Sequence, residues 1–429
     1  MKTSFDVVVV GAGPGGMAAA AVAAEAGKSV CLLDANAAIG GQIWRGNSAE
    51  AAGHGPHAGE FAAWSLRVAG SGVAVRQGVE VVDVPAPGLL RIESEGGGDE
   101  VSFEHLIPAT GGRERFLPFP GWTLRGVTGV GGLQALVKAG LDIRGTRVVV
   151  AGTGPLLLAV AAAMKRAGAS VEAIVEQAPL ATLLRFGVAA LSHPAKLIEG
   201  AGYRSEMLSA SYLTGWWVTR AGGTDRVESV TLSCGREEKT LACDWLACGY
   251  HLVPNLELPR LLGCTIQAGY VAVDDMQQSS VPGVWCVGEL TGIGGMEKAI
   301  VEGQIAGFAS AGFSERARAL ARRRRKWIDF AASLDRAFTP RPELRALPTA
   351  GTIVCRCEDV THEQLAPKRN WREAKLHTRC GMGPCQGRIC GGAAEFLYGW
   401  DVAAVRPPVF PAKVSTLAAE EHAATVRGA

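Results

Sequence analysis

Five cysteines lie close together near the carboxyl end of this 429-residue chain, which contains 11 cysteines in all. They occupy the segments VCRCEDV and TRCGMGPCQGRICGG, as Cys355, Cys357, Cys380, Cys385 and Cys390. So many thiols in a glycine-rich stretch indicate a metal site or a cluster site, because four cysteine thiolates can hold a zinc ion or an iron–sulfur cluster.

The spacing of these cysteines favours an iron–sulfur cluster over zinc. Structural zinc sites usually draw a pair of ligands from C-x-x-C or wider spacing, whereas one residue separates Cys355 from Cys357. The second pair is ambiguous, because equal gaps of four residues separate Cys380, Cys385 and Cys390. One of these three is spare if four thiolates bind. Zinc and free structural thiols stay open as alternatives.

The amino-terminal segment has the pattern of a dinucleotide-binding unit. A buried strand over residues 6–10 leads into Gly11-Ala12-Gly13-Pro14-Gly15-Gly16, an Ala-rich helix follows, and the next strand ends at Asp34. In this pattern Gly11 makes a tight turn, Gly13 lets a pyrophosphate approach the backbone, and Gly16 lets the helix pack closely on the strand. Asp34 would accept a hydrogen bond from an adenosine ribose.

Three further segments favour FAD as the bound nucleotide, because each is similar to a segment of flavoproteins with two dinucleotide-binding domains. They contribute Gly41 and Gln42 in GGQIWR, Thr110 and Gly111 at the end of a strand, and Gly288, Glu289 and Gly295 in CVGELTGIGG. The first runs beside the flavin ring in such proteins, and the acidic residue of the last contacts the ribityl or pyrophosphate region. Pro108 cannot donate to a strand ladder, so its strand is expected at an edge or bent there.

A second glycine unit, Gly152-Thr153-Gly154-Pro155-Leu156-Leu157, precedes a helix and a strand that ends at Glu176. Leu157 replaces the third glycine, so we expect the helix to be pushed outward and a nucleotide pocket to be narrowed. The unit is therefore structural, binds NAD(H), or binds another adenine nucleotide such as ATP.

Composition excludes some functions. The net charge is +2, which gives no general attraction to nucleic acid or to membranes, and no long apolar stretch lacks a turn signal. We expect the run Arg322–Lys326 to be a solvated helix face. The chain begins directly with a strand and has no signal-peptide pattern, which predicts the cytoplasm, where thiols stay reduced.

The six cysteines outside the cluster are expected to be buried structural thiols: Cys31, Cys234, Cys243, Cys248, Cys264 and Cys286. No C-x-x-C pair occurs anywhere in the chain. The redox dithiol of a thioredoxin-reductase-like enzyme is therefore missing from the sequence.

On these motifs the chain resembles the large flavoprotein subunit of heteromeric amino-acid, amine and opine dehydrogenases. This is the family of the octopine and nopaline oxidase A subunits, the hydrogen cyanide synthase B subunit and the D-hydroxyproline dehydrogenase flavoprotein. The segments that carry the resemblance are GAGPGG, GGQIWR, PFPGW, GVGGLQALVK, CVGELTGIGG, CRCEDVT and GMGPCQGRICG.

The resemblance implies an α/β fold of two Rossmann-like domains of the glutathione- and thioredoxin-reductase type, followed by a small [2Fe–2S] domain similar to bacterioferritin-associated ferredoxin. We expect a discontinuous FAD domain over 1–120 and 268–315 and a second, NAD(P)-binding-like domain over 121–267. A helical linker over 316–349, the cluster domain over 350–400 and a tail over 401–429 would follow.

The resemblance also implies the cluster ligands and the activity. Cys355, Cys357, Cys385 and Cys390 would hold the [2Fe–2S] cluster, leaving Cys380 spare. A partner flavoprotein of the D-amino-acid-oxidase type would oxidise an amino acid, imino acid or opine to an imine. Electrons would pass through FAD and the cluster of this chain to a carrier or quinone. Further expectations are a small ferredoxin-like partner and an FMN at an interface between the proteins of the complex.

Two other functions remain in view at this stage. The first is an NAD(P)H-dependent flavoprotein reductase that acts alone through Gly152 and Gly154; Leu157 argues against it. The second is a non-catalytic assembly subunit, which the intact first glycine motif disfavours. No His, Asp or Lys constellation near the flavin motifs suggests a general base, so no catalytic residue is predicted.

Overall fold

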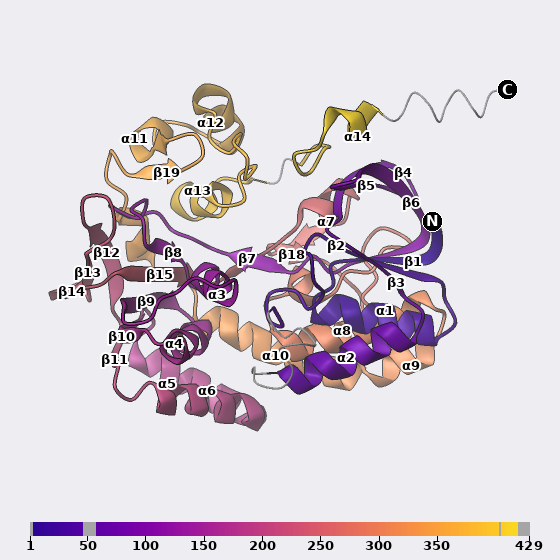
Figure 1. Ribbon diagram of the computed structural model, residues 1–429, viewed down its shortest axis with the longest axis horizontal. Helices are drawn as coiled ribbons and strands as arrows, with labels where there is room; N and C mark the ends of the chain where they lie inside the picture. Colours follow the sequence, from indigo (N-terminus) through magenta and orange to yellow (C-terminus); the bar gives the residue numbers. More distant parts are fainter. Residues whose placement is uncertain (1–2, 46–56, 403–404, 419–429) are drawn as a thin grey trace. The chain divides into compact units, whose positions relative to one another are not determined.

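The computed structural model describes residues 3–45, 57–402 and 405–418, and the chain divides into two compact units (Figure 1). The first unit comprises Met1–Gly112, Pro254–Ala332 and Ala403–Ala429. The second comprises Arg113–Val253 and Ser333–Val402. Each unit is therefore assembled from segments that are distant in the sequence.

The first unit is built on a six-stranded sheet with the order β3-β2-β1-β6-β5-β4. The strands are β1 (Ser4–Val10), β2 (Val30–Asp34), β3 (Ala74–Gln77), β4 (Glu80–Ala86), β5 (Leu89–Ser94) and β6 (Gly97–Pro108). Strands β3, β2, β1 and β6 are parallel, whereas β5 and β4 continue the sheet in antiparallel pairs. The apolar run of β1 is buried on both faces, as expected for a parallel strand covered by helices.

Pro108 does not lie in an edge strand, which was one of the two alternatives predicted for it. Strand β6 is central in the sheet and pairs with β1 on one side and β5 on the other. Pro108 is its last residue and lies opposite Val10. The proline is tolerated because the strand ends there.

Helices of the first unit pack on this sheet and on one another. They are α1 (Pro14–Glu25), α2 (Ala58–Gly70), α7 (Glu257–Leu261), α8 (Met296–Ser310), α9 (Ser314–Ala319) and α14 (Val414–Ala418), with the short 3-10 turn η3 (Gly288–Thr291) and the hairpin β17 (Ile266–Gln267) and β18 (Tyr270–Val271). Helices α1 and α8 pack at close range because α8 has glycines at the crossing. A Cβ at Gly303 would overlap the carbonyl oxygen of Gly15, and one at Gly307 would lie 2.7 Å from that of Ala19.

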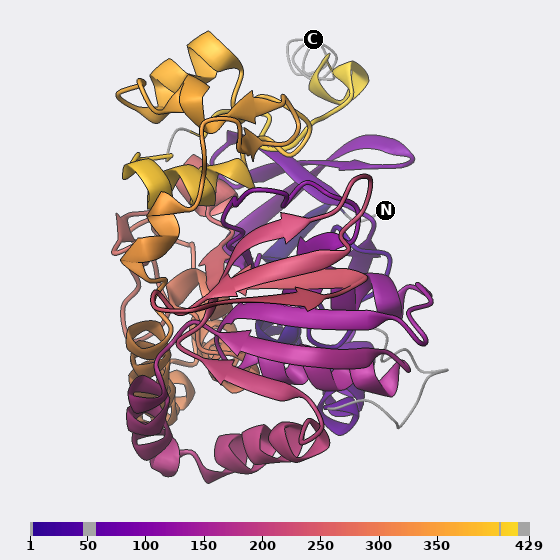
Figure 2. The same ribbon diagram turned by 90° about the vertical axis from the view of Figure 1, so that its left-hand side faces the viewer.

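The second unit contains a five-stranded, all-parallel sheet with the order β11-β10-β9-β15-β8 (Figure 2). Its strands are β8 (Val127–Gly129), β9 (Arg147–Thr153), β10 (Ser170–Glu176), β11 (Ser211–Thr214) and β15 (Trp245–Tyr250). An antiparallel sheet is formed by β12 (Trp217–Gly222), β13 (Ser229–Ser233) and β14 (Glu238–Ala242), and β7 (Gly112–Glu114) pairs with β16 (Leu252–Pro254). The helices are α3 (Val130–Lys138), α4 (Leu156–Arg166), α5 (Leu180–Ala189) and α6 (Pro194–Glu206), with the 3-10 turn η2 (Ala190–Ser192).

The five clustered cysteines belong to a small part of the second unit that has its own core. Its elements are β19 (Ile353–Cys355), β20 (Val360–Thr361), α11 (His362–Leu365), α12 (Trp371–Thr378) and α13 (Cys390–Tyr398), whereas the preceding 3-10 turn η4 (Pro342–Ala346) packs through Leu344 in the core of the larger sheets. The side chain of Asn370 caps α12 by accepting a hydrogen bond from the Glu373 amide, and α12 ends at Arg379 in the left-handed conformation. These two signals fix where the chain turns toward Cys380.

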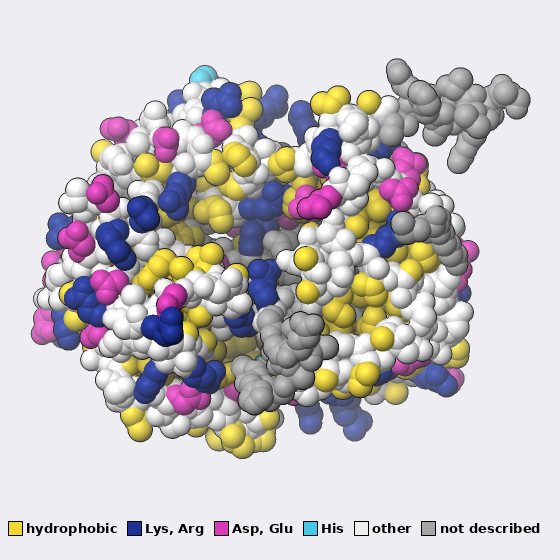
Figure 3. All heavy atoms as spheres, viewed as in Figure 1, with side chains coloured by type: hydrophobic (Ala, Val, Ile, Leu, Met, Phe, Trp, Pro, Cys, Tyr) yellow, Lys and Arg dark blue, Asp and Glu magenta, His cyan; other side chains and the backbone are white. Residues whose placement is uncertain are grey.

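The basic run lies on α10 (Ala321–Ala337), and most of it is solvated as predicted. Arg324 is the exception, because its side chain is buried and its Nε lies 3.5 Å from Glu302. Basic and acidic side chains are interspersed over the face in Figure 3, in keeping with the small net charge. No helix in the described ranges is long and apolar enough to cross a membrane.

Candidate cofactor sites

The first glycine motif joins β1 to α1 and needs glycine at both ends. A Cβ at Gly11 would overlap the carbonyl oxygen of Ala109, and one at Gly16 would overlap that of Gly11. Helix α1 begins at Pro14 with Gly13 as its N-cap, and Gly15 and Gly16 lie buried in its first turn. The motif thus closes the strand-to-helix turn tightly and exposes the amino end of α1.

An open place remains beside Gly13. Among the atoms that the structure describes, a Cβ at Gly13 would meet none nearer than the Cα of Gly41, at 4.0 Å. Gly41 has φ +59°, and the amide of Gly40 donates to the carbonyl oxygen of Ala12, so the loop containing Gly41 is tied to the motif. Gln42 follows with an exposed side chain. The free space at Gly13 fits a phosphate group approaching the amides of α1.

Asp34 ends β2 and is nearly inaccessible to solvent. One carboxylate oxygen accepts from the amide of Ala12 at 2.6 Å. The other accepts from the amide and the side chain of Asn36, both at 2.7 Å. Asp34 therefore fixes the glycine turn relative to the β2 terminus, which is where a ribose is expected.

Thr110 and Gly111 follow β6 and are held by Asn255, a residue that the sequence did not single out. The Thr110 hydroxyl donates to the carbonyl oxygen of Asn255 at 2.9 Å, and the Asn255 side chain donates to that of Thr110 at 2.8 Å. The Asn255 amide also donates to the carbonyl oxygen of Gly111. These bonds join segments 145 residues apart, so only the folded chain shows them.

Glu289 supports the amino end of α8 through the preceding turn. Its carboxylate accepts hydrogen bonds from the amides of Gly294 and Gly295, at 3.0 and 3.2 Å. Burial raises the pKa of this carboxyl, while the Lys298 charge and the two amides act in the opposite direction. Gly295 has φ +83°, a conformation that favours glycine at this N-cap. The contacts predicted between Glu289 and FAD stay a prediction.

The buried ion pair of Lys298 and Glu302 bonds both the carbonyl oxygen and the amide of Gly288. The Lys298 ammonium donates to a carboxylate oxygen of Glu302 at 2.8 Å and to the carbonyl oxygen of Gly288 at 3.0 Å. The same carboxylate accepts from the Gly288 amide and from the Thr291 hydroxyl. The Lys298 and Glu302 side chains are 2% and 0% exposed, so removal of one partner would leave the other buried without it. Sequence reasoning missed this pair, although its spacing of four residues on a helix was a signal.

The second glycine motif differs from the first in how its acid is used. One oxygen of the Glu176 carboxylate accepts from the Gly154 amide at 2.7 Å, and the other accepts from the Thr153 hydroxyl at 2.7 Å and the Ala178 amide at 2.8 Å. Burial raises the pKa of Glu176 to about 7, although these hydrogen bonds favour its charged form. Leu157 lies in the first turn of α4, and its side chain is buried in the hydrophobic core.

The segment after α10 covers the end of β10 next to Glu176. The Gln177 side chain donates to the carbonyl oxygen of Thr339 and accepts from the amide of Arg341. The Arg341 guanidinium lies 4.1 Å from the centre of the Trp217 ring. The polar groups beside Glu176 are therefore bound by the chain's own residues.

The structure brings the five clustered cysteines together. The Sγ atoms of Cys355, Cys380 and Cys390 all lie within 4.8 Å of one another, and these three residues are buried. Cys390 also contacts Cys385, and Cys385 contacts Cys357. Cys357 is exposed and Cys385 is half-buried. The trio thus includes Cys380, which the resemblance leaves out of the ligand set.

The contacts within this group lower the pKa of Cys355 and Cys385, whereas burial and neighbouring sulfurs raise the pKa of Cys357, Cys380 and Cys390. The amide of Gly381 donates to the Cys355 sulfur at 3.5 Å. Hydrogen bonds from the thiols of Cys380 and Cys390 lower the pKa of Cys355 to about 2. A contact from Cys390 lowers the pKa of Cys385 to about 5. Such thiolates are the form that binds metal.

The cysteines outside this group are thiols without disulfide bonds. Five of them are buried as predicted, whereas Cys234 is only half-buried because it lies in the turn between β13 and β14. Burial raises the pKa of Cys243 to about 12, which keeps this thiol uncharged.

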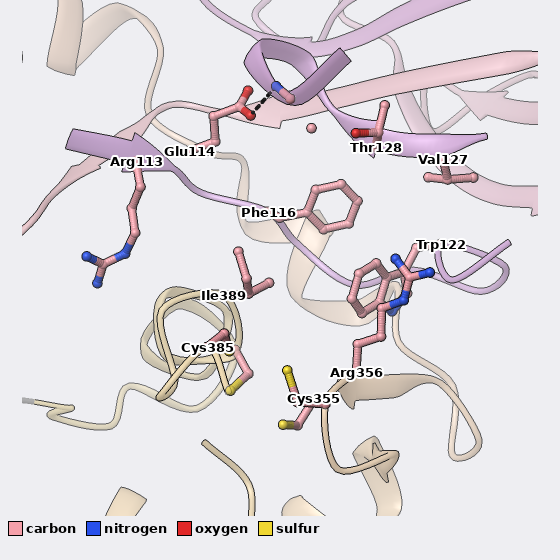
Figure 4. Close-up of a pocket in the computed structure, with 14 residues that line it drawn as sticks. Arg113, Glu114, Phe116, Trp122, Val127, Thr128, Cys355, Arg356, Cys385 and Ile389 are labelled. Carbon is pink, nitrogen blue, oxygen red and sulfur yellow. Dashed lines mark hydrogen bonds between the residues drawn. The ribbon is translucent and has the colours of Figure 1, made fainter. Parts of the chain in front are cut away.

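A cavity of about 480 Å³ opens beside the cysteines within the second unit (Figure 4). Four cysteines line one end, as Cys355, Cys357, Cys385 and Cys390. Phe116, Trp122 and Ile389 form apolar walls, and Glu114 lies at the far end with its carboxylate bonded to the amides of Gly131 and Gly132 at the start of α3. Burial raises the pKa of Glu114.

Two hydrogen bonds tie the cysteine region to the rest of the second unit. The Trp122 indole donates to the carbonyl oxygen of Ile353 at 2.6 Å. The Arg113 guanidinium donates to the backbone carbonyl oxygen of Arg388 at 3.1 Å. They hold the chain two residues before Cys355 and two residues before Cys390.

Residues 5–306 match the family described as pyridine nucleotide-disulphide oxidoreductase. The chain belongs to this family. It is 32% identical to the HcnB subunit of the hydrogen cyanide synthase of Pseudomonas protegens, over 91% of each chain. It is 31% identical to the opine oxidase A subunit of Rhizobium meliloti, over 96% of this chain and 98% of the relative. The resemblance drawn from the motifs is confirmed.

Solved structures show the same fold. An L-proline dehydrogenase from P. horikoshii superposes with a TM-score of 0.67 at 17% identity, covering 97% of this chain and 79% of that chain. A thioredoxin reductase from T. acidophilum superposes with a TM-score of 0.56 at 23% identity, covering 73% and 100%. The chain is therefore an FAD-dependent oxidoreductase with the thioredoxin-reductase type of Rossmann fold, and its relatives are subunits of multi-subunit enzymes.

Proposed function

We propose that this chain is the electron-transferring subunit, with FAD and a [2Fe–2S] cluster, of a heteromeric dehydrogenase. The complex oxidises an amino acid, imino acid or opine to an imine. The observation that carries the proposal is the meeting of five cysteine sulfurs in one small region of an FAD-dependent oxidoreductase.

The residues of this region fit a cluster. Cys355, Cys357, Cys385 and Cys390 are the proposed ligands, and they line one end of a single cavity. The turns between them are tight, because a Cβ at Gly381 would lie 2.5 Å from the Trp371 ring. When bound, a [2Fe–2S] cluster supplies one-electron transfer, and nearby amides tune its potential. The Gly381 amide is one such donor to a cysteine sulfur.

The first glycine motif fits FAD by the same kind of test. Any side chain at position 13 would fill the place beside Gly13, which is the N-cap residue at the amino end of α1. We propose that Gly11, Gly13, Pro14, Gly15 and Gly16 hold the pyrophosphate, and that Asp34 binds the ribose. Gly41, Gln42, Thr110, Gly111, Gly288, Glu289 and Gly295 complete the proposed contacts.

We place the oxidation of the substrate on a partner subunit. The relatives named above are subunits of a hydrogen cyanide synthase and an opine oxidase, and a structural neighbour is an L-proline dehydrogenase. The partner would be a flavoprotein of the D-amino-acid-oxidase type, with a small ferredoxin-like subunit beside it. A hydride leaves the carbon and a proton leaves the nitrogen as the carbon–nitrogen bond becomes double. This cytoplasmic chain then passes the two electrons to a carrier, or to a quinone of the inner membrane.

Spectroscopy of the full-length chain tests the proposal. Protein purified without oxygen and reduced with dithionite should contain two irons per chain and give the EPR signal of a reduced [2Fe–2S] cluster. Released flavin should be FAD. Expression with the neighbouring subunits, followed by a screen of opines, hydroxyproline, proline and glycine with a dye acceptor, identifies the substrate. Iron-free protein with no EPR signal would contradict the cluster, and protein without flavin would favour an assembly role.

A further inference from the structure

Cys380 belongs to the buried trio of sulfurs, with Cys355 and Cys390. It follows the left-handed residue Arg379 at the end of α12, and its side chain is fully buried. Its amide is 3.3 Å from the Thr378 hydroxyl, and Gly381 with φ +78° directs the next amide at Cys355. The backbone on both sides of Cys380 is thus fixed by local contacts.

The buried trio contains one cysteine from each of the two proposed ligand pairs, together with Cys380. Cys355 belongs to the C-x-C pair and Cys390 to the C-x-x-x-x-C pair, and Cys380 lies within 4.8 Å of both sulfurs. The remaining member of each pair, Cys357 or Cys385, is the more exposed one. Cys380 is therefore next to the buried member of each pair.

These distances suit a shared metal ion. Two thiolates on one tetrahedral metal lie about 3.8 Å apart, given metal–sulfur bonds of about 2.3 Å. A sulfur within 4.8 Å of Cys355 or of Cys390 reaches that separation with a movement of about 1 Å or less. Each iron of a [2Fe–2S] cluster takes two cysteine sulfurs, so the five cysteines offer one thiolate more than the cluster uses.

We propose that Cys380 is a reserve ligand of the cluster site, able to replace Cys357 beside Cys355 and Cys385 beside Cys390. This inference rests on the cluster of the proposed function. A bound cluster therefore survives the loss of either exposed ligand, because the buried thiol completes the set of four. A merely structural thiol at this position would leave the cluster dependent on Cys357 and Cys385.

The test compares single and double alanine variants of the full-length chain, purified without oxygen. Alanine is used because a serine oxygen can itself bind iron. C357A and C385A should keep about two irons per chain, with shifted g-values in the EPR spectrum of the reduced protein. In C357A/C380A and C385A/C380A, the iron content per chain and the EPR signal should each fall at least tenfold. C380A alone should match the unsubstituted chain.

The matched control is C357A/C243A, which removes a second buried thiol from the same unit but far from the cluster in sequence. It should keep the iron of C357A, and FAD content should be equal in all variants. Loss of iron from both single variants, or retention of iron by both doubles, would overturn the inference. An unsubstituted chain without a cluster would instead refute the proposed function.

Discussion

The carboxylate of Glu176 accepts a 2.7 Å hydrogen bond from the backbone amide of Gly154, the second glycine of the second glycine motif. In the first motif the corresponding acid, Asp34, bonds the amide one residue earlier, at Ala12. The second glycine of such motifs is where a pyrophosphate approaches the backbone. Glu176 thus places a carboxylate at the amide that would receive the phosphate.

We therefore expect NADH not to reduce the flavin of the isolated chain. The phosphate would have to displace a buried carboxylate, and Gln177 is held by Thr339 and Arg341. Anaerobic mixing with NADH should leave the flavin absorbance unchanged over minutes, whereas dithionite as the control should bleach it at once. Rapid, stoichiometric bleaching by NADH would favour the stand-alone reductase instead.

Glu176 also predicts a pH dependence of stability. Its pKa is about 7 in the fold, above the ordinary value of 4.5, so the folded state binds the proton more tightly. The stabilisation is full below about pH 4.5 and is lost as pH rises through about 7, with an upper limit on the order of 3 kcal/mol.

Urea unfolding at about pH 5 and about pH 7.5 measures this effect. The free energy of unfolding should fall between the two pH values by more in the unsubstituted chain than in Glu176→Gln, which has no charge to titrate. Equal falls in the two proteins would show that Glu176 is ionised throughout.

Much of the first glycine motif could be predicted because its signals are local. Gly11, Gly13 and Gly16 are required by a turn and a helix start that span six residues, and Asp34 ends the very next strand. Asn255 could not be predicted, because it meets Thr110 across 145 residues and asparagine is ordinary in a loop. Its role depends on the return of the chain to the first unit.

For the clustered cysteines, too, the sequence predicted the kind of site but not every residue of it. Their spacing predicted a metal site, but it could not choose between Cys380 and Cys390. That choice depends on where α12 ends and α13 begins, and on the packing of both helices around Trp371. Arg324 was mispredicted as solvated for a related reason, because its buried partner Glu302 lies on a different helix.

Alanine substitutions at Gly13 and at Gly16 should distinguish an effect on flavin binding from an effect on the stability of the fold. Gly13→Ala adds a Cβ that meets no atom nearer than 4.0 Å in residues 3–45, 57–402 and 405–418, at φ −75° that alanine adopts readily. The flavin-free stability should change by less than about 1 kcal/mol, while flavin content should fall at least tenfold.

Two other glycine substitutions serve as comparisons for the flavin content and stability of Gly13→Ala. Gly16→Ala would overlap the carbonyl oxygen of Gly11 and should lower stability itself. Gly59→Ala on α2 meets no atom of the described residues within 4 Å and should keep the flavin. Flavin absorbance of purified protein and urea unfolding of the flavin-free form give both quantities. Full flavin content in Gly13→Ala would move the pyrophosphate away from this turn.

The buried pair of Lys298 and Glu302 should be costly to break. Lys298→Met leaves a fully buried carboxylate with Arg324 at 3.5 Å as its remaining cation, which should cost about 3–5 kcal/mol of unfolding free energy. Lys298→Met/Glu302→Gln removes the buried negative charge as well and should recover part of that loss. A single variant that loses under about 1 kcal/mol would show that the Glu302 charge is neutralised in another way.

Trp122 should control how firmly the cysteine region holds its iron. Trp122→Phe keeps an aromatic wall for the cavity but removes the 2.6 Å bond to the carbonyl oxygen of Ile353, at a cost of about 1–3 kcal/mol for the unsatisfied group. Because this bond lies two residues before Cys355, iron should pass to a chelator several-fold faster. Trp44→Phe is the matched control, since the Trp44 indole nitrogen has no hydrogen-bond partner among the described residues. Equal rates of iron loss in the two variants would mean that the bond to Ile353 does not hold the cluster region in place.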